Sequence, residues 1–486
     1  MFARAGGPPY VEEIRGAKLI DNELPAPLID PAGDYAKFVT ELSYGDIPAE
    51  VLDLLKQRLL DTLACMVAGS NETGVTALVD YARECGGTPQ STIIVYGDQV
   101  PAGSAAFTNG PMARALDMGD CHAEGQHISE YVVPVLFALA EAGKKVSGRR
   151  FLEAYCVGGE IQARIGNACF GLSGLARYRK TVNYTQWGAI CAGAKLLELD
   201  FETTWNAIGI GYSITGSSDF QCVAEGNQMV RMKHAFTCAD AVHSLALARR
   251  GIVGTRQVFL GGRGFLATQY PLKNDPARLL TGLGTQWEWL DTFTKAYACC
   301  YGSHAAITGT LNLLRQHKIE IDAIERIECG MHPTSLGLVA EPRERKWHPA
   351  TATEAQFSHP FCLASAVIKG QLLPPDYAPE ERARKDIRDL MDRITVHARP
   401  EDSGTFAATV NVVTKGGASY EQTIDQPYGS RGNPLGWDGE IDKFRTCCGL
   451  AARSIPARSI DAAIEMCRRL EELDDVAPLM RLLVGT

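Results

Sequence analysis

The sequence predicts a mainly α fold in which a large all-helical domain, made of both chain ends, carries an inserted smaller α+β lid domain. Two observations predict it. Amphipathic helical patterns follow one another over most of the first 290 residues or so, and near that point the pattern changes to the alternation typical of strands. With 486 residues, 45% of them hydrophobic, the chain has enough apolar material for two to three domains.

The first strong helical pattern is PAEVLDLLKQRLLDTLACMVAGS at 48–70. Pro48 suits the first helical position, apolar residues recur with the helical period, and Gly69 marks the end. Comparable patterns, many of them ending at glycine or at a basic pair before glycine, predict helices at 73–86, 102–116, 131–143, 148–165, 185–198, 201–215, 233–250 and 303–316. Small residues in GAICAGAKLL (188–197) allow close helix crossing.

Strand patterns define the inserted domain. RIECGMH (326–332) and RITVHA (393–398) alternate apolar and polar residues, and 408–424 reads as a hairpin around Lys415-Gly416-Gly417. A turn-rich connector at 428–444 follows, and helical pattern returns at 459–483. We therefore expect an N-terminal extension at 1–34, an all-helical domain at 35–288 and 426–486, and an α+β lid domain at 289–425.

Composition excludes several classes of partner. The formal net charge is -9 and basic residues are scattered, so nucleic acid is not an expected partner. Apolar runs such as 132–140 are shorter than the roughly 20 residues of a membrane span, and the N-terminus lacks a signal pattern. A cytoplasmic protein is expected. The 15 cysteines form no CxxC pair, which favours reduced thiols in the core.

The stretch ALDMGDCHAEGQH (115–127) concentrates titratable groups before a strongly apolar helix. Its Asp117, Asp120, His122 and His127 do not have the spacing of a closed zinc site, so no metal is expected. A structural alternative is that Ser129 or an acidic residue caps the next helix. Because one capping oxygen does not account for two imidazoles, we favour general acid–base chemistry at this loop. The glycine run LGGRGF (260–265) lacks the order and context of a nucleotide site, so no cofactor is expected.

Several motifs together resemble the MmgE/PrpD family over nearly the whole chain, from about residue 35 onward. They are LLDTLACMVAG (59–69), the ALDMGD…H loop with VVPVLFALAEAGKKVSG, KLLELD, LGGRGF, KAYACC…H, AQFSHPFCLASAVIKG (355–370) and NPLGWDGEIDKF. Members of this family include 2-methylcitrate dehydratase, cis-aconitate decarboxylase and iminodisuccinate epimerase. The resemblance implies a homodimer with a helical domain, a lid domain, and a metal-free site in the cleft between them.

The resemblance also implies site residues. The family's loop carries an Asp, a hydroxylic residue four positions later and a His ten positions later, which match Asp117, Cys121 and His127. The family's helical His before the lid strands matches His304. A lysine that holds substrate carboxylate falls at Arg231 or Lys233, and the sequence leaves both eligible.

Two departures from the family pattern stand out. The segment 171–200 has no His where members carry one, and a family Tyr is replaced by Phe361, with His359 two residues earlier. Arg179, Lys180 or Tyr184 are candidate replacements as cations or proton donors. We expect substrate contacts from residues of these segments and of the loop, namely Arg231, Cys121, His122, Phe361, Tyr184 and Lys180.

The expected chemistry follows from the residues. Loss of a proton or CO₂ next to a carboxylate builds negative charge, which requires fixed cations and a base. His127 and His304 serve as acid and base, Arg231 and Lys233 as clamps, and Asp117 orients a neighbouring His. We therefore predict a metal-independent lyase that dehydrates or decarboxylates a small carboxylate substrate. The alternatives are an isomerase or epimerase that uses the same His pair and a catalytically silent, metabolite-binding dimer.

Overall fold

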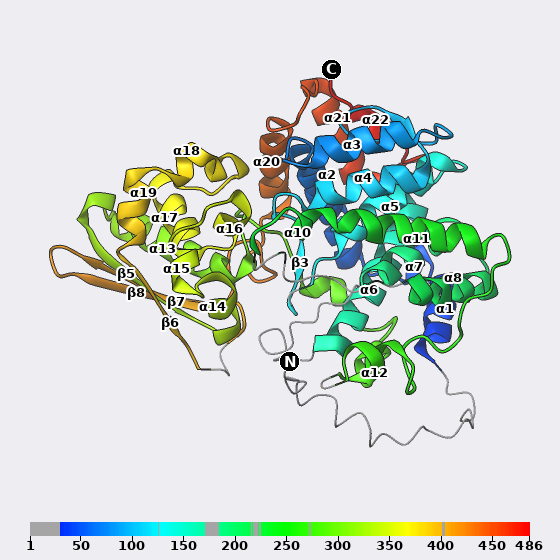
Figure 1. The fold of residues 1–486 in the computed structure, drawn as a ribbon, viewed down its shortest axis with the longest axis horizontal. Helices are drawn as coiled ribbons and strands as arrows, with labels where there is room; N and C mark the ends of the chain where they lie inside the picture. The colour runs from blue at the N-terminus through cyan, green and yellow to red at the C-terminus, as the bar shows by residue number, and fades with distance from the viewer. Residues whose placement is uncertain are drawn as a thin grey trace, which may run out of the picture.

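The computed structural model describes residues 30–124, 126–170, 184–214, 216, 222, 225–271, 274–400 and 404–486. Most of the predicted N-terminal extension and Lys180 lie outside these residues. The fold is mainly α, as predicted. In Figure 1 the four-stranded sheet and the helices around it lie on the left, and the remaining helices lie on the right.

The larger group of helices follows the predicted pattern closely. From the N-terminal side it comprises α1 (Pro31–Glu41), α2 (Ala49–Gly69), α3 (Val75–Cys85), α4 (Ala102–Arg114), α5 (Ser129–Ala142), α6 (Gly148–Phe170), α7 (Gln186–Leu196), α8 (Phe201–Ile214), α10 (Met229–Met232), α11 (His234–Ala248) and α12 (Phe265–Gln269). The C-terminal segment adds α20 (Gly436–Cys448), α21 (Ala457–Arg468) and α22 (Pro478–Leu482). One expectation was wrong: much of the predicted connector at 428–444 is helical, because α20 begins at Gly436 and its Phe444 and Cys447 are buried.

Close helix crossings explain the small residues of α7. Every residue from Gln186 to Leu196 is buried, so the helix is enclosed on all sides. At the crossing with α6, a Cβ on Gly158 would lie 3.0 Å from the carbonyl oxygen of Gly188, and one on Gly188 would lie 2.7 Å from that of Gly158. Larger side chains at these two positions would separate the helices, as close packing allows little room.

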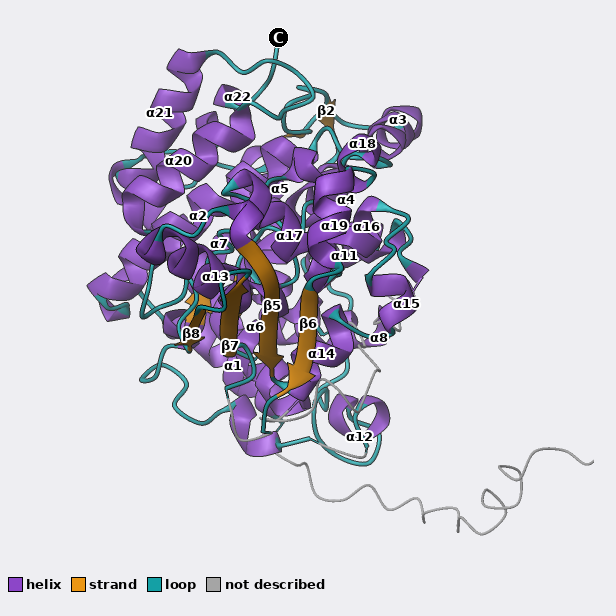
Figure 2. Ribbon diagram, turned by 90° about the vertical axis from the view of Figure 1, so that its left-hand side faces the viewer, coloured by secondary structure: helices purple, strands orange, loops and turns teal. Residues whose placement is uncertain are grey.

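The sheet has the strand order β6-β5-β7-β8 (Figure 2). Its strands are β5 (Ile324–Met331), β6 (Ile394–Ala398), β7 (Ala408–Thr414) and β8 (Ser419–Ile424). Strand β6 runs parallel to β5, whereas β7 is antiparallel to both β5 and β8. The hairpin turn lies at Lys415-Gly416-Gly417 as predicted, with Gly417 at a φ of +82°. Helix α13 (His304–His317) contacts β7 and β8, and α17 (His359–Lys369) packs on α13.

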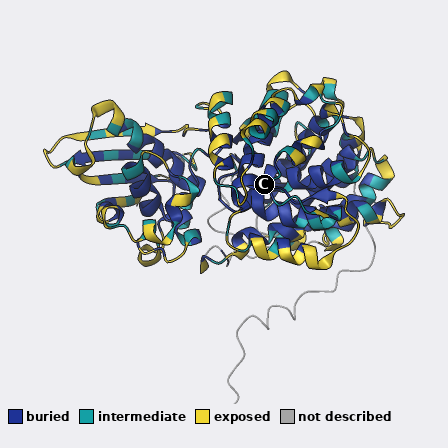
Figure 3. Ribbon diagram, turned by 90° about the horizontal axis from the view of Figure 1, so that it is seen from above, coloured by how far each residue is buried: buried dark blue, intermediate teal, exposed yellow. Residues whose placement is uncertain are grey.

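Shorter helices complete this part of the molecule. They are α14 (Pro333–Val339), α15 (Arg343–Lys346), α16 (Ala352–Gln356), α18 (Pro379–Arg382) and α19 (Lys385–Met391). Buried residues fill the interior on both sides of the molecule, as Figure 3 shows from above. All 15 cysteines are free thiols and only Cys85 is exposed, which confirms the predicted core thiols. No helix in the described ranges is both long and apolar enough to span a membrane.

Two short ladders tie loops to the helices. Strand β1 (Ser91–Thr92) pairs with β2 (Gln99–Val100). Strand β3 (Cys121–His122) pairs antiparallel with β4 (Thr292–Phe293), and Cys121 lies opposite Phe293. The second ladder brings the loop between α4 and α5 beside the segment that leads into the sheet, so the titratable loop and the KAYACC motif meet in space.

Candidate active site

Asp117 lies in the loop that follows α4 and binds two cations. Its carboxylate contacts the guanidinium of Arg114, and its Oδ1 is 3.2 Å from the Nζ of Lys295. Lys295 also donates to the backbone carbonyl of Asp117 at 3.1 Å. Burial favours the protonated acid, but Arg114, Lys295 and His127 outweigh it and hold the pKa of Asp117 well below its usual range. Both cation contacts fall on Oδ1, while Oδ2 has no hydrogen-bond partner among the described residues, so the role of Asp117 in orienting a neighbouring His stays a prediction.

His127 has a defined tautomer. Its Nδ1 donates to the backbone carbonyl of Asp120 at 3.0 Å, which leaves the lone pair on Nε2. Burial lowers the pKa of His127 to about 4, with Glu130 raising it and Arg114 and Lys295 lowering it further. The ring is therefore neutral at pH 7. With Nδ1 donating, Nε2 is the ring atom that can accept a proton, and the side chain as a whole keeps 21% of its exposure.

Asp120 has a structural role. Its carboxylate accepts from the backbone N–H of Ser129 at 3.1 Å and from the Ser129 hydroxyl at 2.6 Å, at the first turn of α5. Burial raises the pKa of Asp120 to about 6. The capping alternative is thus correct for Asp120, while His127 remains available for chemistry.

His122 and Cys121 face a different environment. The Nδ1 of His122 accepts from the backbone N–H of Glu124 at 3.2 Å, so the proton is on Nε2, which lies 3.3 Å from Glu288. The side chains of His122, Glu288 and Asp291 come within 4.8 Å of one another, close enough for a metal site. In this tautomer, however, Nε2 has no lone pair for a metal. Burial raises the pKa of the Cys121 thiol, which packs with an aromatic cluster of Phe293, Tyr301 and Phe406.

His304 begins α13 and is fully buried. Its ring lies against Tyr297 and Tyr301, with ring centroids 5.1 and 4.8 Å away, and its Nε2 is 3.4 Å from the carbonyl oxygen of Cys299. Burial and the charge of Lys295 lower the pKa of His304 to about 3. His304 is therefore neutral, and in this arrangement it is closed off from solvent.

Arg231 bridges the two sides of the molecule. Its guanidinium is 2.6 Å from a carboxylate oxygen of Glu72 and donates to Thr353 at 3.0 Å and Gln356 at 3.1 Å. Gln356 donates in turn to the carbonyl of Leu116, next to Asp117. Lys233 is half-buried at the end of α10. Of the two eligible cations, Arg231 is the one linked through Gln356 to the loop.

The remaining predicted residues lie in the interior or outside the described residues. Phe361 is fully buried in α17, with its ring centroid 5.8 Å from that of Tyr377. Tyr184 is buried just before α7, and burial raises its pKa. Substrate contact by either residue stays a prediction. Arg179 and Lys180 fall in 171–183, outside the described residues.

Sequence reasoning missed four charged or titratable groups of the cluster: Arg114, Glu130, His234 and Lys295. Glu130 accepts from the Nε2 of His234 at 2.8 Å, lies 3.7 Å from the Nε of Arg114, and its other oxygen is 3.9 Å from the Nδ1 of His127. His127, Arg114 and His234 outweigh burial and lower the pKa of Glu130 to about 2. The available signal was a charge inside an apolar pattern, as for Glu130 in SEYVVPVLFALAEA.

Unpartnered polar atoms mark the centre of this cluster. Among the described residues, Asp117 Oδ2, Glu130 Oε2, His234 Nδ1 and His304 Nδ1 are buried without a hydrogen-bond partner. Such atoms are rare in folded proteins, because leaving them unpaired is energetically costly. The buried cations beside these atoms, Arg114, Lys295 and Arg231, are the groups that can attract an anionic ligand.

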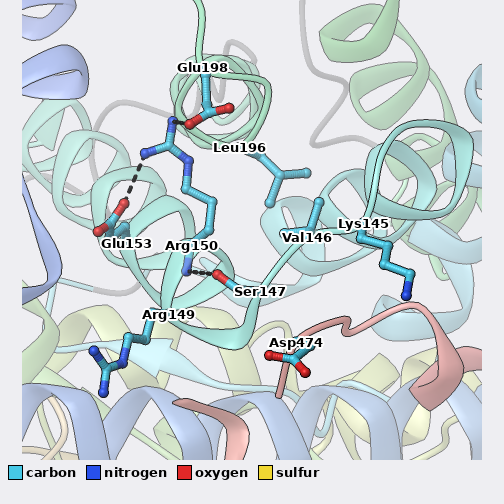
Figure 4. A pocket seen from close by; sticks show the side chains of 9 residues that line it. All are labelled: Lys145, Val146, Ser147, Arg149, Arg150, Glu153, Leu196, Glu198 and Asp474. Atoms are coloured by element: carbon cyan, nitrogen blue, oxygen red, sulfur yellow. Dashed lines mark hydrogen bonds and ion pairs between the residues drawn. The ribbon is translucent and has the colours of Figure 1, made fainter. Parts of the chain in front are cut away.

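A surface cleft of about 430 Å³ lies elsewhere, at the N-terminal end of α6 (Figure 4). Its lining includes Lys145, Arg149 and Arg150. Arg150 is 2.9 Å from Glu153 and 3.6 Å from Glu198, so its charge is already compensated. None of the catalytic candidates lines this cleft.

Two family models and several known proteins match this chain. Residues 33–275 match the MmgE/PrpD N-terminal domain, and residues 297–472 match the MmgE/PrpD C-terminal domain. The cis-aconitate decarboxylase-like protein oryM of Aspergillus oryzae is 29% identical, covering 93% of this chain and 97% of its own. Cis-aconitate decarboxylase of Aspergillus terreus is 25% identical over 92% and 94% of the two chains, and that of Homo sapiens is 24% identical over 93% and 94%.

Proposed function

The chain belongs to the MmgE/PrpD family and is an enzyme of the dehydratase or decarboxylase type of lyase, and we propose that its substrate is a small polycarboxylate. The observation that carries this proposal is the set of three buried cations, Arg114, Lys295 and Arg231, beside the loop that bears His127. A carboxylate that gains negative charge as a proton or CO₂ leaves needs cations already in place.

His127 is the base of the proposed reaction. Its Nδ1–H is held by the carbonyl of Asp120, so Nε2 can take a proton from the carbon next to the substrate carboxylate. The imidazolium that forms is stabilised by Glu130, 3.9 Å from Nδ1. In a decarboxylation, the bond to CO₂ breaks, its electron pair is delocalised toward a remaining carboxylate, and a His127 that has taken a proton from water delivers that proton to the carbon. His304 is the proposed acid of the pair, and because it is neutral in this arrangement it must take up a proton before it can donate one.

We propose that Lys295, Arg114 and Arg231 bind the substrate carboxylates. Lys295 and Arg114 are neutralised in part by Asp117, and Arg231 by Glu72. A bound carboxylate gains most where such cations are removed from water, because electrostatic attraction is stronger at low dielectric. These side chains supply charge stabilisation without a metal, and we propose a metal-independent reaction.

Access to this site requires movement. His304 is fully buried, and Arg231 and Asp117 each have 4% exposure. Arg231 contacts Thr353 and Gln356 across the boundary between the helices and the sheet-bearing part. We propose that residues 289–425 act as a lid whose opening admits substrate and whose closure excludes water.

We further propose that two copies of the chain form a homodimer. An aromatic patch of Tyr81, Phe107 and Phe236 crosses α3, α4 and α11, with ring centroids 5.9 and 5.4 Å apart. Tyr81 is 54% exposed and Phe236 57%. Contiguous aromatic groups on a surface are typical of interfaces, and this patch supports pairing through these helices.

Proton NMR in D₂O tests the function directly. The purified enzyme is incubated with citrate, 2-methylcitrate or cis-aconitate, with and without chelator, beside the variants His127→Ala and His243→Ala. We expect an alkene or a CO₂-loss product that is insensitive to chelator and falls by roughly 10²- to 10⁴-fold in His127→Ala. His243 is exposed on α11, and its variant should keep full activity.

Other outcomes contradict the proposal in distinct ways. Deuterium uptake without net conversion would favour an epimerase that uses the same histidines. Binding of these acids without turnover, unchanged by His127→Ala, would favour a silent binding protein. Loss of activity with chelator would contradict the metal-independent reaction.

A further inference from the structure

Glu130 is a buried carboxylate whose two oxygens face two imidazoles. It lies in the first turn of α5, 1% exposed, with Oε1 2.8 Å from His234 Nε2 and Oε2 3.9 Å from His127 Nδ1. A carboxylate buried in this way is costly unless its charge is compensated. Arg114 from α4 supplies a positive charge 3.7 Å away and His234 from α11 supplies a hydrogen bond, while His127 from the loop attracts Glu130 once its ring is charged.

Two contacts hold the ring of His234 in place, the hydrogen bond to Glu130 and stacking on Tyr131. Its ring is stacked on Tyr131, with centroids 4.4 Å apart and planes 16° apart. Its Nε2 must carry the proton, because Glu130 is ionised and can only accept. His234 is 2% exposed, and its Nε2 donates to Glu130. The contact that the structure gives its Nε2 is therefore with the carboxylate, which it holds in place.

The other charges around His127 do not duplicate this role. Lys295 and Arg114 are positive and oppose protonation of the ring. The carboxylate of Asp117 favours it, but this carboxylate already contacts both cations. The Asp120 group that His127 contacts is an uncharged backbone carbonyl. Gln162 donates to the backbone oxygen of His127 and adds no charge. Glu130 is therefore the anion positioned to stabilise a positively charged His127.

We propose that Glu130 and His234 are positioning residues for His127: His234 fixes the Glu130 carboxylate, and that carboxylate stabilises His127 once the ring has taken up a proton. The proposal rests on the proposed function, in which His127 is the base. It assigns the carboxylate partner of the catalytic imidazole to α5 and its anchor to α11.

The test begins with a readout that does not need a substrate. The chain has 10 histidines, so NMR of ¹³C-labelled histidine, with His127 assigned from His127→Gln, follows protonation of this ring in each variant. Because Glu130 favours the charged ring, Glu130→Gln should lower the proton affinity of His127 about tenfold, one pKa step. His234→Leu should lower it in the same direction, whereas His234→Gln keeps an N–H donor and should restore it toward wild type.

Matched controls lie on the same helices. Glu141→Gln removes a carboxylate at the far end of α5 that accepts from Thr92, and His243→Leu replaces an exposed histidine of α11. Neither should move the titration of His127. If Glu130→Gln does not fold, the comparison of His234→Leu with His234→Gln decides the matter. An unchanged His127 titration in His234→Leu and Glu130→Gln would overturn the proposal.

Steady-state kinetics, measured on the acid that the wild-type enzyme turns over, provides a second readout. The acid limb of kcat/KM should move to lower pH in Glu130→Gln, and kcat should fall because a weaker base removes the proton more slowly. KM should change little. A titration shift without any wild-type activity would support the positioning pair and contradict the proposed function, so the two failures are distinguishable.

Discussion

At the residue scale, His122 and His127, five positions apart in the loop between α4 and α5, have different proton positions because of one hydrogen bond each. The backbone N–H of Glu124 donates to Nδ1 of His122 and places its proton on Nε2, toward Glu288. The Asp120 carbonyl accepts from Nδ1 of His127 and leaves Nε2 basic. Tautomer, and therefore chemistry, depends on backbone groups that no residue pattern specifies.

Asp117 should make the stability of the fold depend on pH. Its folded pKa lies below its unfolded value of about 4, so its contribution is present at neutral pH and is lost as the pH falls below about 4. Asp117→Asn leaves Arg114 and Lys295 buried with less compensation, and breaking such a pair costs about 3–5 kcal/mol.

Calorimetry from pH 7 down to pH 3 checks this expectation. The Tm of Asp117→Asn should lie well below that of wild type at pH 7, and the gap should narrow below about pH 4. Asp461→Asn, which removes an exposed partner of Arg445, should change Tm little. A gap that stays constant over the whole range would show that the Asp117 charge is not the cause.

Arg231 and Lys233 should differ in substrate binding. Arg231 is buried and linked through Gln356 to the loop, whereas Lys233 is half-buried at the end of α10. Losing a charged hydrogen bond to a carboxylate weakens binding affinity by roughly 10- to 100-fold. Arg231→Met should therefore raise KM by that factor, and Lys233→Met should raise it much less. Steady-state kinetics on the carboxylic acid that the enzyme turns over checks this prediction. A larger rise of KM in Lys233→Met than in Arg231→Met would assign carboxylate binding to Lys233.

At the element scale, the sequence predicts helices better than it predicts contacts between them. The apolar period and Gly69 locate α2 within one residue of its observed ends. The same pattern reading treats 428–444 as a connector, because the glycines of GNPLGWDGE outweigh the apolar positions that bury α20. The role of Lys295 cannot be predicted from the sequence pattern, because its hydrogen bond to Asp117 joins residues 178 positions apart. No local spacing encodes such a partner.

A methyl group added at Gly159 of α6 should clash with Trp289 and destabilise the fold. A Cβ there would lie 2.1 Å from the Cζ2 of Trp289, whose ring is fully buried and donates to the Cys156 carbonyl at 2.9 Å. Gly159→Ala should cost about 1–3 kcal/mol or more by overpacking. Displacing Trp289 also moves the segment that leads into β4, so activity should fall with stability.

Helix α14 offers the matched control, because a Cβ on its Gly337 would meet nothing within 4 Å. Gly337→Ala should leave the Tm unchanged or slightly higher, since alanine favours helix. Equal melting temperatures for the two variants would mean that Trp289 adapts to the added methyl.

At the scale of the whole molecule, most of the candidate active-site residues are buried where the helical part meets the sheet-bearing part. The loop after α4, the segment after β4 and α10 come from regions far apart in the chain and converge through β3–β4 pairing and the Arg231 contacts. The outer helices α3, α4 and α11 instead present aromatic side chains to solvent. The two proposals made for these features differ accordingly: the buried site would open to admit substrate, and the exposed apolar face would pair with a second copy of the chain.

Self-association through the aromatic patch should be sensitive to one charge. In a twofold-symmetric pair the same patch occurs on both copies, so Phe236→Glu introduces two carboxylates into one apolar interface. Since Phe236 is 57% exposed, the variant should fold normally. Sedimentation velocity should show a dimer for wild type and a monomer for Phe236→Glu. Val253→Glu, at a position 72% exposed in the loop after α11, should remain a dimer. A dimeric Phe236→Glu would move the interface elsewhere, and a monomeric wild type would contradict the homodimer itself.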